Sequence, residues 1–176
     1  MRFSILAAVV ACASSASAKI TWSIEKVSNP NTDQAEAYEL MEKAVIAAVA
    51  RYERFTDADK TLRLHYVPEV PTADGNYNGD IRYGGDHVYM NEFTTMHEIS
   101  HTLGIGQTAA FEQNCAENNW PIANALLQSW DGEDAQVNCD GTGHINPYGM
   151  NTQAEWDDLH AERHVRLIDA MLQDGM

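Results

Sequence analysis

The segment TTMHEISHTLGIGQ, residues 94–107, constrains the chain most, because it places two histidines and a glutamate on one side of a predicted helix. At about 100° per residue, His97 and His101 lie about 40° apart around the helix and about 6 Å apart along it. Glu98 falls on the same side. Gly104 predicts the end of the helix. Any fold that contains this segment therefore gathers three metal-binding or proton-binding side chains.

Two imidazoles at this spacing are able to bind one tetrahedral zinc ion, and the adjacent glutamate reaches a water on the metal and accepts its proton. An ordinary amphipathic helix is the alternative. Met96, Ile99 and Leu103 form an apolar stripe on the opposite side, and such a helix would also leave both histidines in water. The joint occurrence of histidines, glutamate and helix-ending glycine favours zinc.

The start of the chain predicts export. Residues 1–18 contain Arg2, an apolar run over 3–12 and Ala-Ser-Ala at 16–18, a pattern typical of a secretory signal peptide and its cleavage site. The apolar run is too short to span a bilayer. We therefore expect a secreted, extracellular protein in which residues 19–176 form a single domain.

The cysteines and the charge narrow the class further. Cys115 and Cys139 are the only cysteines after the signal peptide, and an oxidising compartment predicts a disulfide between them, with two free buried thiols as the alternative. The sequence has 26 acidic residues against 11 lysines and arginines, a net charge of −15. Such a surface repels phosphate backbones and anionic lipids. We therefore expect a monomer with neither nucleic acid nor membrane as a partner.

Hydrophobic periodicity outlines the remaining elements. The patterns predict, in order, a strand at 20–24, a long helix at 33–55, a strand at 61–67, a loop with Pro68, Pro71 and Gly75, two short strands at 79–85 and 87–91, the histidine helix from Glu92, a short helix at 123–130, a Gly- and Asn-rich stretch at 132–151 and a last helix at 152–173. This order predicts an α+β fold. Its small mixed sheet has a long backing helix and an active-site helix, and a small irregular C-terminal lobe ends in a helix.

The segment HEISHTLGIGQ resembles the active-site helix and glycine turn of the zincin metalloproteases, specifically the metzincin branch with the pattern H-E-x-x-H-x-x-G-x-x-H or D. The five-residue core and Gly104 match. Gln107 stands where that branch places its third ligand, and a neutral amide oxygen binds zinc weakly. The resemblance implies a zincin-like catalytic domain over 19–176 with bound Zn²⁺. It also implies hydrolysis of a peptide or protein substrate, with Glu98 as the general base.

A second segment, GHINPYGMN at 143–151, looks like the methionine turn of that family, with Met150 as the methionine. It is also similar to H-x-x-P-Y-G-[LM]-N in secreted microbial H-E-x-x-H proteins of unknown activity. We expect His144 to be the third zinc ligand because it offers an imidazole directly before the turn, with Gln107 and Asp140 as alternatives. Tyr148 is a candidate donor to the oxyanion of a tetrahedral intermediate, and packing on the proline turn is its alternative.

Other histidines receive structural interpretations. His160 and His164 repeat the four-residue spacing within a highly charged stretch, and we expect both to face solvent. His65 and His87 alternate with apolar strand residues and are interpreted as structural. In the family, an edge strand near 87–91 aligns an extended peptide by main-chain pairing, and an ordinary sheet edge is the alternative here.

These expectations describe a secreted zinc endopeptidase in which His97, His101 and His144 hold the metal and Glu98 activates a water. A secreted protein that keeps zinc for structure or binding is the alternative. Gln107 and the short second lobe favour that alternative.

Overall fold

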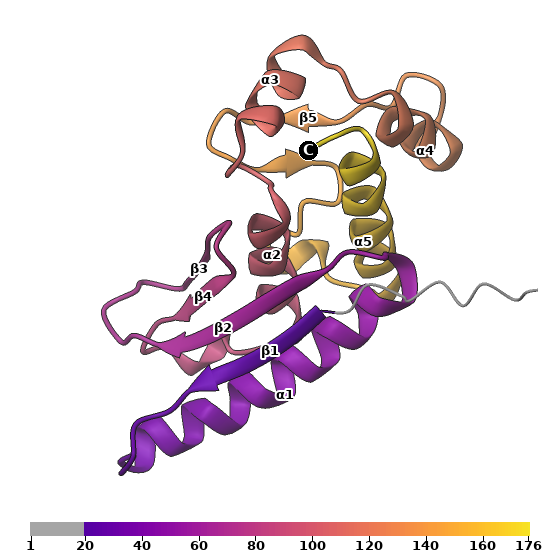
Figure 1. Ribbon diagram of the computed structural model, residues 1–176. Helices are drawn as coiled ribbons and strands as arrows, with labels where there is room; N and C mark the ends of the chain where they lie inside the picture. Colours follow the sequence, from indigo (N-terminus) through magenta and orange to yellow (C-terminus); the bar gives the residue numbers. More distant parts are fainter. Residues whose placement is uncertain (1–19) are drawn as a thin grey trace, which may run out of the picture.

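The computed structural model describes residues 20–176, so the expected signal peptide at 1–18 lies outside the described residues. A four-stranded sheet packs with two helices, and a group of shorter elements completes the molecule (Figure 1). This mixed architecture confirms the expected α+β class. The sheet has the order β1-β2-β4-β3, with strands β1 (Ile20–Glu25), β2 (Lys60–Tyr66), β3 (Ala73–Gly75) and β4 (Asp80–Tyr83).

The sheet is parallel except at one edge. Strands β1, β2 and β4 run parallel, whereas β3 pairs antiparallel with β4. Alternate side chains of a strand point to opposite faces, and those on the inner face are fully buried here: Leu62, Leu64, Ile81 and Tyr83. Within residues 20–176 no strand pairs with the outer side of β3. Within these residues, strand β3 is therefore one of the two free edges of the sheet, and β1 is the other.

Helix α1 (Thr32–Phe55) connects the parallel strands β1 and β2 and lies along the sheet (Figure 1). Its start is fixed by a capping box: the Asn31 side chain accepts from the Gln34 N–H at 2.9 Å, and the Gln34 side chain accepts from the Asn31 N–H at 3.1 Å. Its buried residues recur at threes and fours, as predicted: Ala37, Tyr38, Met41, Ala44, Val45, Ala48, Val49 and Tyr52.

Helix α2 (Glu92–Leu103) carries the histidine motif and lies between the sheet and the C-terminal part of the chain (Figure 1). The Asn91 side chain caps its first turn by accepting from the Thr94 N–H at 2.9 Å. Gly104 ends it with φ of 139°, a backbone conformation that L side chains rarely adopt. The predicted helix and its predicted end are confirmed.

The C-terminal part is more regular than expected. It contains α3 (Ala109–Glu117), α4 (Pro121–Asp131), the hairpin of β5 (Asn138–Cys139) with β6 (Ile145–Asn146), a 3₁₀ turn η2 (Gln153–Glu155) and α5 (Asp158–Gln173). Helix α3 was not predicted, although Thr108 caps it by accepting from the Phe111 N–H at 3.0 Å. A disulfide joins Cys115 of α3 to Cys139 of β5, as expected.

The expected strand at 87–91 is wrong. Residues His87–Tyr89 form a 3₁₀ turn, η1, because the Asp86 side chain caps it by accepting from the Val88 N–H at 3.1 Å. The antiparallel edge strand is instead β3, inside the stretch interpreted as a loop. The last helix begins at Asp158, after η2. Among residues 20–176, none of the helices combines the length and apolar character that a membrane crossing requires.

Candidate metal centre

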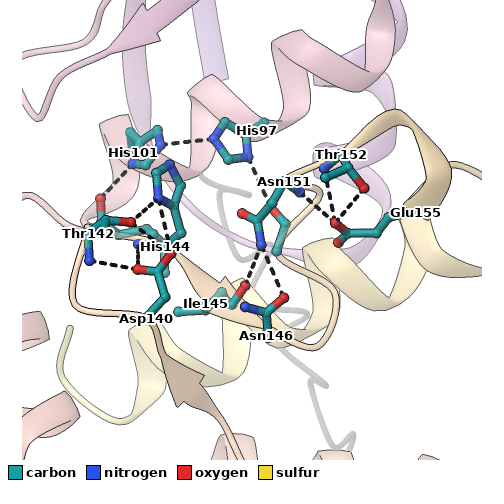
Figure 2. Close-up of polar contacts among 12 residues, drawn as sticks. His97, His101, Asp140, Thr142, His144, Ile145, Asn146, Asn151, Thr152 and Glu155 are labelled. Carbon is teal, nitrogen blue, oxygen red and sulfur yellow. Dashed lines mark hydrogen bonds and ion pairs between the residues drawn. The ribbon is translucent and has the colours of Figure 1, made fainter.

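Three histidines from two distant segments meet at one point. His97 and His101 lie one turn apart on α2, and His144 comes from the turn between β5 and β6 (Figure 2). One nitrogen of each ring lies within 4.8 Å of the others. The ring centroids are 4.8 Å apart for His97 and His101, and 5.3 Å from each of these to His144. The structure thus brings together the three residues expected to bind the metal.

Backbone carbonyls determine how the two helix histidines carry their protons. The Nδ1 atom of His97 lies 3.0 Å from the Gly149 oxygen, and that of His101 lies 2.8 Å from the Ile105 oxygen. A carbonyl oxygen only accepts hydrogen bonds, so both Nδ1 atoms carry the proton of a neutral ring. Both Nε2 atoms then present lone pairs, and these atoms lie 3.1 Å apart.

Two facing lone pairs repel each other unless a cation lies between them. Zinc binds imidazole nitrogen at about 2.0–2.1 Å, so two ligands at tetrahedral angles lie about 3.3 Å apart. The observed separation of 3.1 Å between the Nε2 atoms of His97 and His101 is close to that value. The donor set of three imidazoles and the spacing of His97 and His101 therefore fit a zinc ion.

Asp140 and Thr142 orient His144 in the same way (Figure 2). The Thr142 hydroxyl donates to Asp140 Oδ2 at 2.7 Å, so its oxygen is free to accept from His144 Nδ1 at 2.9 Å. The Asp140 Oδ1 atom also accepts from the backbone N–H groups of Thr142 and His144. These hydrogen bonds lower the pKa of Asp140. Asp140 therefore organises the turn, and the imidazole of His144 points its Nε2 atom away from it.

Burial sets the electrostatics of the helix residues. Glu98 is 5% exposed and His101 is 9% exposed, so the interpretation of α2 as a helix with a solvent-facing side is wrong. Burial, followed by the neighbouring His101, lowers the pKa of His97 to about 3. Burial also lowers the pKa of His101. Both rings therefore stay neutral at physiological pH and keep their lone pairs.

Glu98 behaves in the opposite direction. Burial raises its pKa to about 8, and the nearby Asp74 adds to the effect, whereas the Gly75 N–H donates to the carboxylate and opposes it. An anionic Glu98 therefore needs positive charge close by, and a dication among the neighbouring imidazoles would supply it. Gly75 lies so close to α2 that a Cβ there would sit 2.5 Å from the Glu98 carbonyl oxygen.

The histidines open into a pocket of about 420 Å³. One wall is β3 with its preceding residue, and another is formed by α2 and the C-terminal turn. The lining residues are Thr72, Ala73, Asp74, Gly75, Tyr89, Phe93, Thr94, His97, Glu98, His101, Gln107, His144, Met150 and Asn151. The cluster is therefore reachable from solvent, and Gln107 lines the same pocket.

Tyr148 and Met150 differ in their relation to this pocket. Met150 is buried and lines it. Tyr148 is buried outside it, where its hydroxyl contacts both oxygens of Asp131 at 2.9 Å and accepts from Arg163. Its ring packs edge-on against Trp130. The packing interpretation of Tyr148 fits this arrangement better than a role as oxyanion donor.

The expectation that both histidines of α5 face solvent is wrong for His164. His164 is 1% exposed, whereas His160 is half-exposed and pairs with Asp157 at 2.7 Å. A signal was present in the sequence, because His164 shares a stripe at threes and fours with Ala161, Val165, Ile168 and Met171, which are all buried. The many charged residues of the segment favoured a solvent-facing interpretation although this apolar stripe was present.

No family model matches the chain, and no curated protein or solved structure matches it either. What the site is able to do therefore follows from its own side chains.

Proposed function

We propose that the protein is a secreted zinc-dependent peptidase with a zincin-like, metzincin-type domain. The observation that carries this proposal is the orientation of the three imidazoles. Each Nδ1 atom has a hydrogen-bond acceptor, so each Nε2 atom is left free to bind the same ion. The disulfide supports export, because such bonds persist in oxidising compartments.

Three protein ligands and an open pocket favour catalysis over a structural role. Structural zinc sites are closed by four protein ligands, whereas catalytic sites keep one position for water or substrate. The cluster has three histidines and faces a pocket. A zinc-binding protein without hydrolytic activity remains the second candidate, and the neutral Gln107 at the pocket is the feature that favours it.

When bound, zinc would polarise the scissile carbonyl and make a water acidic enough to attack near neutral pH. Glu98 lines the same pocket and lies directly after His97, so it is the group that takes the proton from the attacking water. It then returns this proton to the leaving amine. His97, His101 and His144 would hold the ion through their Nε2 atoms, and their Nδ1 hydrogen bonds hold the rings in place.

The free edge of β3 offers a binding site for an extended peptide. Residues Ala73–Gly75 line the pocket, and their outer side has no strand partner within residues 20–176. An extended substrate segment would add to this edge by main-chain hydrogen bonds, above Glu98 and the histidines. Main-chain pairing with an extended substrate, expected at 87–91, is therefore proposed for β3 instead.

Zinc analysis and one pair of variants test the proposal. The purified protein should hold about one zinc per chain and cleave members of a peptide library. Glu98→Gln should keep the zinc yet lose about 10² to 10⁴ in rate, because it removes the base and leaves the ligands. Glu133→Gln, an exposed loop residue, is the matched control and should leave the rate unchanged.

Two results would contradict this assignment. Loss of zinc in Glu98→Gln would make Glu98 a ligand. A zinc-loaded parent that cleaves no peptide would favour the non-catalytic candidate.

A further inference from the structure

Two buried polar side chains lie behind the proposed metal site, and neither lines the pocket. His164 of α5 is 1% exposed, and Tyr52 of α1 is fully buried. Their polar atoms, the Tyr52 hydroxyl and His164 Nε2, lie 2.9 Å apart. Burying a polar group is costly unless it is hydrogen-bonded. The hydrogen-bond partners of Tyr52 and His164 therefore indicate what these two side chains do.

Each member of the pair holds a backbone carbonyl. His164 Nδ1 donates to the Tyr148 oxygen at 2.7 Å. The Tyr52 hydroxyl donates to the Met96 oxygen at 2.9 Å. Because His164 Nδ1 carries the proton, its Nε2 atom has only a lone pair, and the single proton of the Tyr52 hydroxyl is shared between this atom and the Met96 oxygen.

These two carbonyls flank the hydrogen bond that orients the first zinc ligand. Met96 directly precedes His97, and Tyr148 directly precedes Gly149. His97 Nδ1 donates to the Gly149 oxygen at 3.0 Å. The pair therefore restrains both ends of this hydrogen bond. It holds the donor His97 through the carbonyl of Met96, and the acceptor Gly149 through the carbonyl of Tyr148.

The acceptor side needs such a restraint. Tyr148 and Met150 have φ values of 60° and 58°, in the left-handed region that L residues other than glycine adopt at a cost. A turn of this kind persists only where surrounding contacts fix it. His164 supplies one of these contacts from α5, directly at Tyr148.

We propose that His164 and Tyr52 are positioning residues for His97, which they align for zinc through the carbonyls of Tyr148 and Met96. This inference rests on the proposed function, because it concerns the same metal site. It assigns a role to the one buried histidine outside the three-histidine cluster in residues 20–176.

Variants at position 164 separate positioning from packing. The side-chain NH₂ of His164→Asn falls near the place of Nδ1 and is able to donate to Tyr148. That of His164→Gln reaches the place of Nε2, near Tyr52, and leaves Tyr148 without its donor. His164→Phe fills the volume and offers no hydrogen bond. Zinc affinity would be measured by competition with a chromophoric chelator, ligand geometry by the visible spectrum of the cobalt-substituted protein, and stability by urea unfolding of metal-free protein.

We expect His164→Asn to keep the cobalt spectrum and a zinc affinity within about threefold of the parent. His164→Gln and His164→Phe should weaken zinc affinity by about tenfold to a hundredfold and shift the spectrum, as is typical of lost support behind a ligand. All three variants should lose stability without metal. Equal zinc affinities in the three variants, or affinities that follow only the stability ranking, would overturn the proposal.

Tyr52→Phe provides a test that leaves the packing intact. It removes only the hydroxyl that holds Met96, so it should weaken zinc affinity and alter the cobalt spectrum. Tyr38→Phe on the same helix is the matched control, because the Tyr38 hydroxyl binds the Val27 N–H away from the site. Equal zinc affinity in both variants would overturn the role of Tyr52. A parent protein that binds neither zinc nor cobalt would refute the proposed function together with this inference, whereas zinc binding with insensitive variants would refute the inference alone.

Discussion

At the scale of single residues, the proposed third ligand is the most unusual feature. The motif predicts a ligand at position 107, where the chain has a glutamine, and His144 meets the other two histidines instead. Gly106 and Gly143 explain how the distant segment reaches this place. A Cβ on Gly106 would lie 2.5 Å from the Gly143 oxygen, so the two backbones are in direct contact. Two glycines therefore let a separate turn bring the His144 imidazole to the other two.

His144→Ala should weaken zinc affinity by several orders of magnitude, because it leaves two imidazoles for an ion that needs three protein ligands. Gln107→Ala should change the affinity by less than about threefold, since a neutral amide oxygen is a weak zinc ligand. Titration against a chelator of known affinity measures both. Small and equal effects would mean that the third ligand is neither of these residues.

At the scale of elements, the length and periodicity of a segment decided how well the sequence predicted it. Helices α1 and α2 were predicted because their patterns extend over several turns and end at recognisable caps. Strand β3 has three residues, too few for an alternation to be visible. At 87–91 an apolar alternation was visible, yet the capping carboxylate of Asp86 imposes a 3₁₀ turn.

The candidate site was predicted for a different reason. His97, Glu98 and His101 follow from helix spacing, and His144 followed from its residue type and its neighbours. The support behind them was not predictable, because hydrogen bonds such as that between Asp140 and Thr142 depend on how a turn folds. The burial of His164 likewise depends on which face of α5 meets the core.

The β5–β6 hairpin leads to a prediction about the disulfide. Each of its strands has two residues, and Cys139 in β5 is bonded to α3 five positions before His144. Replacing both Cys115 and Cys139 by serine should lower the free energy of unfolding by about 2–4 kcal/mol. It should also weaken zinc affinity, because the hairpin loses its anchor to α3.

The activity at saturating zinc should recover in this double variant, since the serines leave every ligand and Glu98 in the chain. Urea unfolding and peptide cleavage over a series of zinc concentrations measure the two effects. A zinc affinity equal to that of the parent would show that the hairpin holds His144 without the disulfide.

At the scale of the whole molecule, the buried His164 predicts acid sensitivity. Burial lowers its folded pKa to about 4, whereas an unfolded histidine has a pKa of about 6.5. Between these values the unfolded chain binds a proton that the folded chain does not. The contribution of His164 to stability is therefore complete above about pH 6.5 and is lost as the pH falls to about 4, by up to about 3 kcal/mol.

Urea unfolding of metal-free protein at pH 7 and pH 4.5 checks this prediction. The parent should lose more stability than His164→Asn over this interval, so the difference between them should narrow at acid pH. His97 and His101 also have lowered pKa values and contribute equally to both proteins. A difference that stays constant with pH would contradict the assignment of the low pKa to His164.

The disulfide also shortens the loop of chain that a metal bound by His101 and His144 would close. An ion held by His101 and His144 joins two distant points of the chain, and the entropy cost of such a closure grows with the logarithm of the loop length. The disulfide joins two residues inside that loop that are 24 positions apart. It therefore bypasses more than half of the residues between His101 and His144. For a chain without other structure this lowers the cost by about 0.7 kcal/mol, about a threefold gain in apparent affinity. We therefore expect the oxidised chain to bind zinc about threefold more tightly than the reduced chain while both are still unfolded.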